Sequence, residues 1–155
     1  MAGEIDRRLE ELGIELPRPA APVANYLPFV TAGKLVFVAG QLPVLDGEIK
    51  YVGKVGRDFG VEEGKAAARL VGVNIIAQVK AACGGDLDRV VRCVKLGGFV
   101  NCVEGFGEQP QVVNGCSDLM VEVFGDNGRH ARFAVGANAL PLGVAVEIDA
   151  VFEIG

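Results

Sequence analysis

Two charged residues lie in segments that otherwise have the apolar pattern of strands. Arg132 shares a strand face with Ala134 and Gly136, whose small side chains leave space around a guanidinium. Glu147 follows Val146 in a run of β-branched residues near the end of the chain. An arginine offers a planar fork of N–H donors that matches a carboxylate, and a glutamate can position or deprotonate a water molecule. If the two segments are neighbouring strands, the pair could face one cavity.

An ion pair is the simpler interpretation of the same two residues. Arg132 and Glu147 could join two strands, which at a protein surface stabilises a fold by only about 0–1 kcal/mol. Spacing alone favours this structural interpretation over the catalytic one.

Three further residues are candidates for contact with a ligand. Tyr26 follows a proline-rich segment and could close over a site, although an amphipathic tyrosine on an edge strand is common. Gly40 follows an apolar strand and could bring its backbone against a ligand, or it simply ends the strand. Asn114 lies in the first turn of a predicted helix, where it caps the helix or faces the cavity. The single histidine, His130, has no serine or cysteine triad pattern around it, and we expect it at the surface.

Composition limits the class of protein. The 155 residues, of which 50% are hydrophobic and 23% charged, fit one folded domain with its own core. A net charge of −5 and scattered basic residues argue against nucleic acid as a partner. With one histidine and no C-x-x-C spacing, we expect no metal site and free thiols in a soluble, cytoplasmic protein. The cysteines are Cys83, Cys93, Cys102 and Cys116. We find no apolar run long enough to cross a membrane.

Hydrophobic periodicity predicts the elements that position these residues. Helical spacing predicts helices over residues 3–14, 61–82 and 111–124. Apolar runs and alternation predict strands over residues 23–30, 34–39, 90–100, 130–137 and 144–154. Pro28 marks the first strand as an edge strand, and Pro17, Pro19 and Pro22 predict an extended connector before it.

This order of elements predicts an α+β fold with a split βαβ arrangement, in which a mixed sheet carries two helices on one face. Several strands alternate apolar residues on both faces. We therefore expect copies of the chain to cover the second face of the sheet for one another. Residues 1–20 are expected to form a helical extension with a proline-rich connector, and residues 21–155 the α+β domain.

The candidate residues belong to an ordered set of motifs that resembles the Rid family, also called YjgF-like or endoribonuclease L-PSP. The set starts with Tyr26, residues 33–43 (GKLVFVAGQLP) and residues 85–91 (GDLDRVV). It continues with Val112-Val-Asn114, Ala131-Arg132, Leu140-Pro141 and Val146-Glu147-Ile148. Together the motifs cover residues 20–154 in order, which is most of the chain.

The resemblance implies a fold, an assembly and an activity. It implies a chorismate-mutase-like α+β fold and a homotrimer with clefts at the subunit interfaces. Members of the best-studied branch hydrolyse reactive enamines and imines such as 2-aminoacrylate, without a cofactor, to a 2-keto acid and ammonia. By this resemblance Arg132 holds the substrate carboxylate and Glu147 the attacking water. The Gly40 backbone and Asn114 contact the small carboxylate-bearing metabolite, and Tyr26 closes the cleft.

The chain departs from that branch at several positions. Ala39 stands where many members carry Ser or Thr, and Ala134 where a Cys is often found. An N-terminal helix precedes the domain, and residues 104–110 (EGFGEQP) differ from the usual loop. These differences predict a divergent subgroup of the family.

Two other functions remain as hypotheses for the same cleft. A non-catalytic trimer that binds or senses a carboxylate metabolite is compatible with the missing hydroxyl at Ala39. The endoribonuclease or translation-inhibitor role attached to the family requires proton-transfer groups beside a cationic phosphate site. An acidic chain with one histidine gives little indication of such a site. We favour the imine hydrolase.

Overall fold

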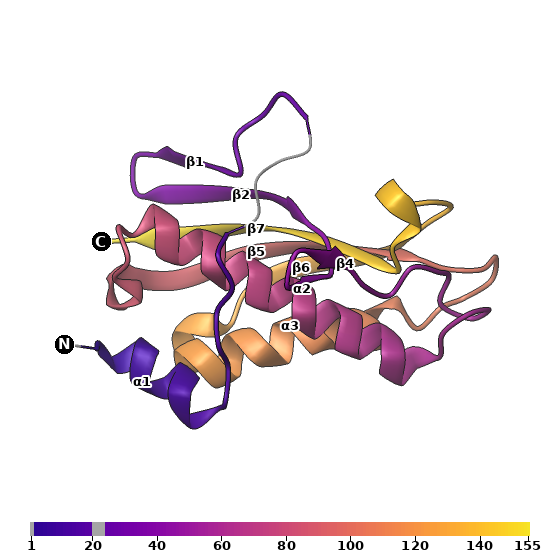
Figure 1. Cartoon of the computed structure of the whole chain (residues 1–155), viewed down its shortest axis with the longest axis horizontal. Helices are drawn as coiled ribbons and strands as arrows, with labels where there is room; N and C mark the ends of the chain where they lie inside the picture. Colours follow the sequence, from indigo (N-terminus) through magenta and orange to yellow (C-terminus); the bar gives the residue numbers. More distant parts are fainter. Residues whose placement is uncertain (1, 20–23) are drawn as a thin grey trace.

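A five-stranded sheet with helices on one of its faces forms the body of the molecule (Figure 1). The structure is a computed structural model that describes residues 2–19 and 24–155. In chain order the strands are β1 (Phe29–Ala32), β2 (Leu35–Gln41), β3 (Val44–Leu45), β4 (Glu48–Ile49), β5 (Val90–Asn101), β6 (Ala131–Ala137) and β7 (Val146–Ile154). The helices are α1 (Glu4–Glu11), α2 (Val61–Ala82) and α3 (Gln109–Phe124), with short 3-10 turns η1 (Leu87–Arg89), η2 (Gly125–Gly128) and η3 (Pro141–Gly143).

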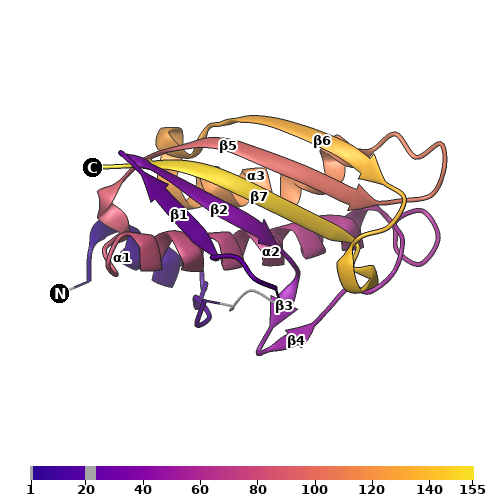
Figure 2. The ribbon, with the colours of Figure 1, turned by 90° about the horizontal axis from the view of Figure 1, so that it is seen from above.

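The strands of the sheet follow the order β1-β2-β7-β5-β6, which Figure 2 shows from above. Strands β5 and β6 are parallel and are joined by α3, whereas the other neighbouring pairs are antiparallel. The predicted split βαβ with a mixed sheet is confirmed. The last strand of the chain, β7, lies in the middle of the sheet, so β6 forms one edge and β1 the other.

The core lies between the sheet and the two long helices. Strand alternation turns one set of β7 side chains inward, and all five are buried: Val146, Ile148, Ala150, Phe152 and Ile154. One apolar face of α2 packs against them, and Ala67, Val71, Ile75 and Val79 on it are fully buried, as the 3.6-residue period requires. The opposite face of the sheet leaves several large apolar side chains exposed: Leu35, Phe37, Phe99 and Val135. We call these four residues the open-face patch.

Local backbone chemistry explains where the elements differ from expectation. The first strand starts only after Pro28, whose missing N–H cannot join a ladder, and Pro22 and Val23 lie outside the described residues. Strand β2 continues through Gly40 to Gln41 instead of ending before it. A turn at Asp46-Gly47 closes a β3–β4 hairpin that the sequence pattern did not predict.

Two register irregularities interrupt the strict alternation of side chains along β5. Strict alternation would place Cys93 and Leu96 on opposite faces, yet both are fully buried. The pairing with β7 shifts between Cys93 and Lys95, which adds one residue and resets the alternation. The shift turns Leu96 toward the helices, and because Arg132 of β6 pairs with Leu96, it sets the face on which Arg132 lies.

The four cysteines are free, as predicted. Burial raises the pKa of the Cys93 thiol to about 12, and it also raises the pKa of the Cys116 thiol. These two thiols are therefore packed as small apolar groups. Among residues 2–19 and 24–155, no helix is long and apolar enough to span a bilayer.

The predicted N-terminal helix forms α1 and is fastened to the domain. The Asp88 carboxylate accepts hydrogen bonds from the backbone N–H groups of Glu4 (3.0 Å) and Ile5 (2.9 Å), which satisfies the first turn of the helix. Lys80 on α2 pairs with Asp6 at 3.1 Å, and Leu9 is buried in the core cluster. The extension thus contributes to the same core as the rest of the chain.

Helices α2 and α3 approach closely at Gly115, where any side chain would collide with the backbone carbonyl of Lys65. We expect Gly115→Ala to destabilise the fold by about 1–3 kcal/mol, because the two helix backbones must separate. Gly64→Ala is the matched control, since a methyl group there meets only side-chain atoms of Val112 and Val55 at 3.1 Å or more. Urea unfolding of both variants measures the difference, and equal free energies of unfolding would contradict the close approach.

Candidate functional site

Strand β2 bulges where it passes Glu147. Val38 pairs with Ala150 and Gln41 with Ile148, so two residues of β2, Ala39 and Gly40, stand opposite one residue of β7. A Cβ atom at Gly40 would overlap the Glu147 carboxylate. The carboxylate therefore lies directly on the Gly40 backbone, in space that only a glycine leaves. Gly40 and Glu147, two of the predicted site residues, are brought together.

The Glu147 carboxylate is half-buried and has no counter-charge. Within the described part of the chain, no hydrogen bond or ion pair engages it. Burial raises the pKa of Glu147, and the negative charge of Asp149 raises it further. A carboxylate with a raised pKa and no partner is suited to hold a water molecule and accept its proton.

Arg132 lies on the opposite side of the sheet, against the flank of α3. It pairs with Leu96, whose side chain is buried under the helices. Its Nη1 donates to the Ser117 hydroxyl (3.0 Å) and its Nη2 to the Pro110 carbonyl (3.1 Å). These two bonds fix the guanidinium and leave its other N–H donors for a ligand.

Asn114 belongs to the same group as Arg132. Residues 110, 114 and 117 follow one another along one face of α3, so Asn114 lies between the two partners of Arg132. Because α3 begins at Gln109, Asn114 stands in the second turn and not in the first, and it does not cap the helix. The pattern located the helix correctly but missed its first two residues.

The sheet order separates the two charged candidates. Strands β6 and β7 are not neighbours, because β5 lies between them. Arg132 pairs with the buried Leu96, whereas Glu147 pairs with Phe99 on the open face. Within one chain the two residues therefore lie on opposite faces of the sheet. Both interpretations that required neighbouring strands, the ion pair and the cavity in one chain, are wrong for a single chain.

Tyr26 lies near the Gly40 end of the site. The Ala39 N–H donates to the Pro28 carbonyl at 2.9 Å, which holds the segment before β1 against the bulge of β2. Tyr26 is two residues before Pro28 and is 47% exposed. Its ring is therefore available for contact with a ligand or with another chain.

Sequence reasoning missed a serine–histidine pair beside Arg132. His130 is partly buried, and its Nε2 lies 2.8 Å from the Ser117 Oγ and its Nδ1 2.6 Å from the Gly128 carbonyl. Burial lowers the pKa of His130, and the Arg132 charge lowers it further against the opposing effect of the Gly128 carbonyl. The sequence predicts His130 at the surface, but it is partly buried because the residue before β6 packs against α3, which brings side chains 13 apart in sequence together.

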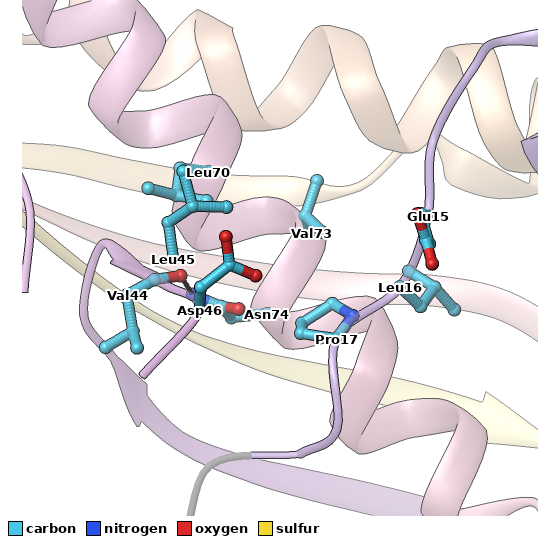
Figure 3. A pocket seen from close by; sticks show the side chains of 9 residues that line it. All are labelled: Glu15, Leu16, Pro17, Val44, Leu45, Asp46, Leu70, Val73 and Asn74. Atoms are coloured by element: carbon cyan, nitrogen blue, oxygen red, sulfur yellow. Dashed lines mark hydrogen bonds between the residues drawn. The ribbon is translucent and has the colours of Figure 1, made fainter. Parts of the chain in front are cut away.

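A separate hollow lies between the N-terminal connector, the β3–β4 hairpin and α2 (Figure 3). It encloses about 310 Å³, with Glu15 and Asp46 among its lining residues. Asn74 donates to the carbonyls of Leu42 and Val44, both at 3.0 Å, and so ties the hairpin to α2. None of the residues predicted to contact a ligand lines this cavity.

Comparison with known proteins places this geometry in a family. The family described as "YjgF/chorismate_mutase-like, putative endoribonuclease" matches residues 6–152. The chain belongs to this family. The predicted Rid (YjgF-like) membership and the chorismate-mutase-like α+β fold are thereby confirmed.

Individual relatives cover nearly the whole chain. Protein TCP17 of Trypanosoma cruzi is 48% identical over 99% of this chain and 96% of its own. A crystal structure from Agrobacterium tumefaciens, of a protein of unknown function, is 51% identical with a TM-score of 0.92, over 97% of this chain and 92% of that one. RidA from an Antarctic Psychrobacter is 28% identical with a TM-score of 0.59, over 88% and 94%.

The charge of Asp149 offers a test of the electrostatics at Glu147. We expect Asp149→Asn to lower the pKa of Glu147, because one of the two causes of its elevation is removed. Carboxyl-detected ¹³C NMR titration measures this pKa directly. Glu10→Gln on α1 makes the same change in net charge at an exposed site of another element. An equal shift in both variants, or none in either, would contradict the local effect.

Proposed function

We propose that the protein hydrolyses small enamines and imines that carry a carboxylate, such as 2-aminoacrylate, to 2-keto acids and ammonia. The reaction takes place in clefts between the subunits of a homotrimer. The observation that carries this proposal is the division of the site. Arg132 at the β6 edge and Glu147 on the open face cannot meet within one chain. Each is available to a ligand, but one chain alone does not provide both sides of the site.

The open-face patch supports a shared site. Phe37 and Phe99 are 45% and 37% exposed on the face that carries Glu147. Large apolar side chains gathered on one sheet face are typical of surfaces that another chain covers. A second copy docked there can bring its own β6 edge, with Arg132, toward the Gly40 and Glu147 of the first. Family membership supports the same arrangement.

The chemistry follows from the two halves. The free N–H donors of Arg132 hold the substrate carboxylate, with Asn114 beside it. An enamine first tautomerises to the imine. Water then adds to the C=N carbon while Glu147 accepts one of its protons, and that proton passes to the nitrogen to give a carbinolamine. The carbinolamine hydroxyl next loses its proton to Glu147, which passes it to the amino nitrogen. The C–N bond then breaks, leaving the C=O group of the 2-keto acid and ammonia. The Gly40 backbone keeps the carboxylate and the substrate in contact, since a side chain there would displace Glu147.

Binding without turnover is the alternative that one observation favours. Ala39 presents a methyl group next to Gly40, where a hydroxyl would supply a further polar contact for the substrate. An assay for pyruvate release from iminopropanoate generated in situ separates the two functions. Binding of pyruvate without any acceleration of hydrolysis would replace the enzyme by a carboxylate-binding protein.

Loss of the guanidinium should abolish most of the activity. We expect Arg132→Gln to reduce kcat/KM for iminopropanoate on the order of ten- to a hundred-fold, because a charge-assisted hydrogen-bonded anchor is removed. Arg69→Gln is the matched control, since Arg69 pairs with Glu122 on the outer helices. Size-exclusion chromatography with light scattering checks the assembly. A variant that loses the trimer together with activity would show that Arg132 is structural.

Mixing two inactive variants tests whether the site is shared. Arg132→Gln and Glu147→Gln chains, unfolded together and refolded at equal amounts, should regain about a quarter of wild-type activity, because random trimers combine an intact Arg132 and an intact Glu147 at that fraction of interfaces. The variants refolded separately provide the control. Mixed oligomers without recovered activity would mean that the two residues do not serve one cleft.

A further inference from the structure

A directed chain of hydrogen bonds leads from the Gly128 carbonyl to Arg132. The carbonyl can only accept, so the proton of the neutral His130 ring resides on Nδ1, which donates to it at 2.6 Å. The Nε2 atom is then an acceptor, and the Ser117 hydroxyl donates to it at 2.8 Å. The Ser117 oxygen in turn accepts from Arg132 Nη1 at 3.0 Å. Ser117 and His130 are the single serine and the single histidine of the sequence.

The charged groups around His130 are mostly cationic. Arg92 and Arg129 line a cavity of about 460 Å³ together with Cys93 and His130. The titratable and charged groups of the elements packed around His130 include Arg92 and Cys93 of β5, Arg132 of β6 and Arg129 before that strand, Ser117 with its neighbour Cys116 of α3, and Asp126 of η2, which binds Arg129 at 3.3 Å. Burial and, after it, the Arg132 charge lower the pKa of His130, so protonation of the ring is disfavoured while Arg132 holds no anion.

We propose that Ser117 and His130 make the Arg132 anchor proton-linked, so that a carboxylate bound to Arg132 is accompanied by a proton taken up on His130. An anion on Arg132 neutralises the nearest guanidinium that opposes protonation of the ring. It also places a negative charge close to the imidazole, with only the Ser117 hydroxyl between Arg132 and the ring. Both effects favour the imidazolium.

The hydrogen-bond chain accommodates the extra proton without rearrangement of the backbone. In the imidazolium, Nε2–H donates to the Ser117 oxygen, which has two lone pairs and still accepts from Arg132. The hydroxyl proton of Ser117 is then free to donate to the bound anion or to a carbonyl of α3. Ser117 is thus a positioning residue that connects the titrating ring to the anchor. The inference rests on the proposed function only for Arg132 as the carboxylate anchor.

Linkage fixes the sign of the pH dependence. If pyruvate raises the His130 pKa, then pyruvate binds more tightly to the protonated protein, and its affinity falls as the pH rises through the interval between the free and bound pKa values. Each unit of the rise corresponds to about tenfold weaker binding above that interval than below it. Glu147 of another subunit faces the same proposed cleft, so the pH dependence of the pyruvate affinity is also measured in Glu147→Gln, which removes that titration.

The test is a proton NMR titration of the whole wild-type protein, with and without pyruvate. The C2 proton of the single histidine gives one resolved signal, so no assignment is needed. We expect pyruvate to raise the His130 pKa and its Kd to increase with pH over the same interval. Ser117→Ala should shrink the pyruvate-induced rise, and Ser117→Thr, which keeps the hydroxyl, should restore it. Isothermal titration in two buffers of different ionisation enthalpy counts the protons taken up.

The outcomes separate this inference from the proposed function. If pyruvate binds with an affinity that Arg132→Gln abolishes, while the His130 pKa stays unchanged, the proton linkage is wrong and the anchor stands. If pyruvate fails to bind, or binds Arg132→Gln equally well, the anchor and the linkage are both wrong. If pyruvate raises the His130 pKa equally in wild type and in Ser117→Ala, Ser117 does not connect the ring to Arg132, and that part of the inference is wrong.

Discussion

The position of β7 in the middle of the sheet determines most of the structure. Its inward side chains form the base of the core under α2, and its outward side chains carry Glu147 and Asp149 beside the β2 bulge. Because the last strand of the chain occupies the place between β2 and β5, the parallel β5–α3–β6 unit is displaced to the edge. Arg132 and Glu147 are therefore separated by β5, and the pairing of each with that strand places them on opposite faces.

The separation also explains how two uncompensated charges are tolerated. A half-buried carboxylate and a partly buried guanidinium would neutralise each other if they met, and neither would then be free for a ligand. On opposite faces, neither residue meets a counter-charge among residues 2–19 and 24–155: Glu147 lies against the Gly40 backbone, and Arg132 is held by a hydroxyl and a carbonyl. Both charged groups therefore remain available to a polar ligand.

Sequence patterns predicted the features that depend on one element at a time. The stripe of α2 gave its exact limits, because 22 residues repeat a 3.6-residue period, and the alternation of β7 identified its buried face. The bulges of β2 and β5 were not predictable, since they depend on the partner strand and not on local preference. The strand order and the Ser117–His130 contact were missed for the same reason. Each is a pairing between distant segments that periodicity within one segment does not encode.

The arrangement of the chain ends has a consequence for how this protein can be joined to others. Helix α1 and the end of β7 lie at the same end of the molecule, whereas Glu147 lies at the start of β7, toward the other end (Figure 1). A second polypeptide encoded in frame at the C-terminus would be attached beside the N-terminal helix and away from Gly40. Genetic fusion, surface immobilisation or tandem linkage of copies through that end would therefore leave the carboxylate half of the site accessible.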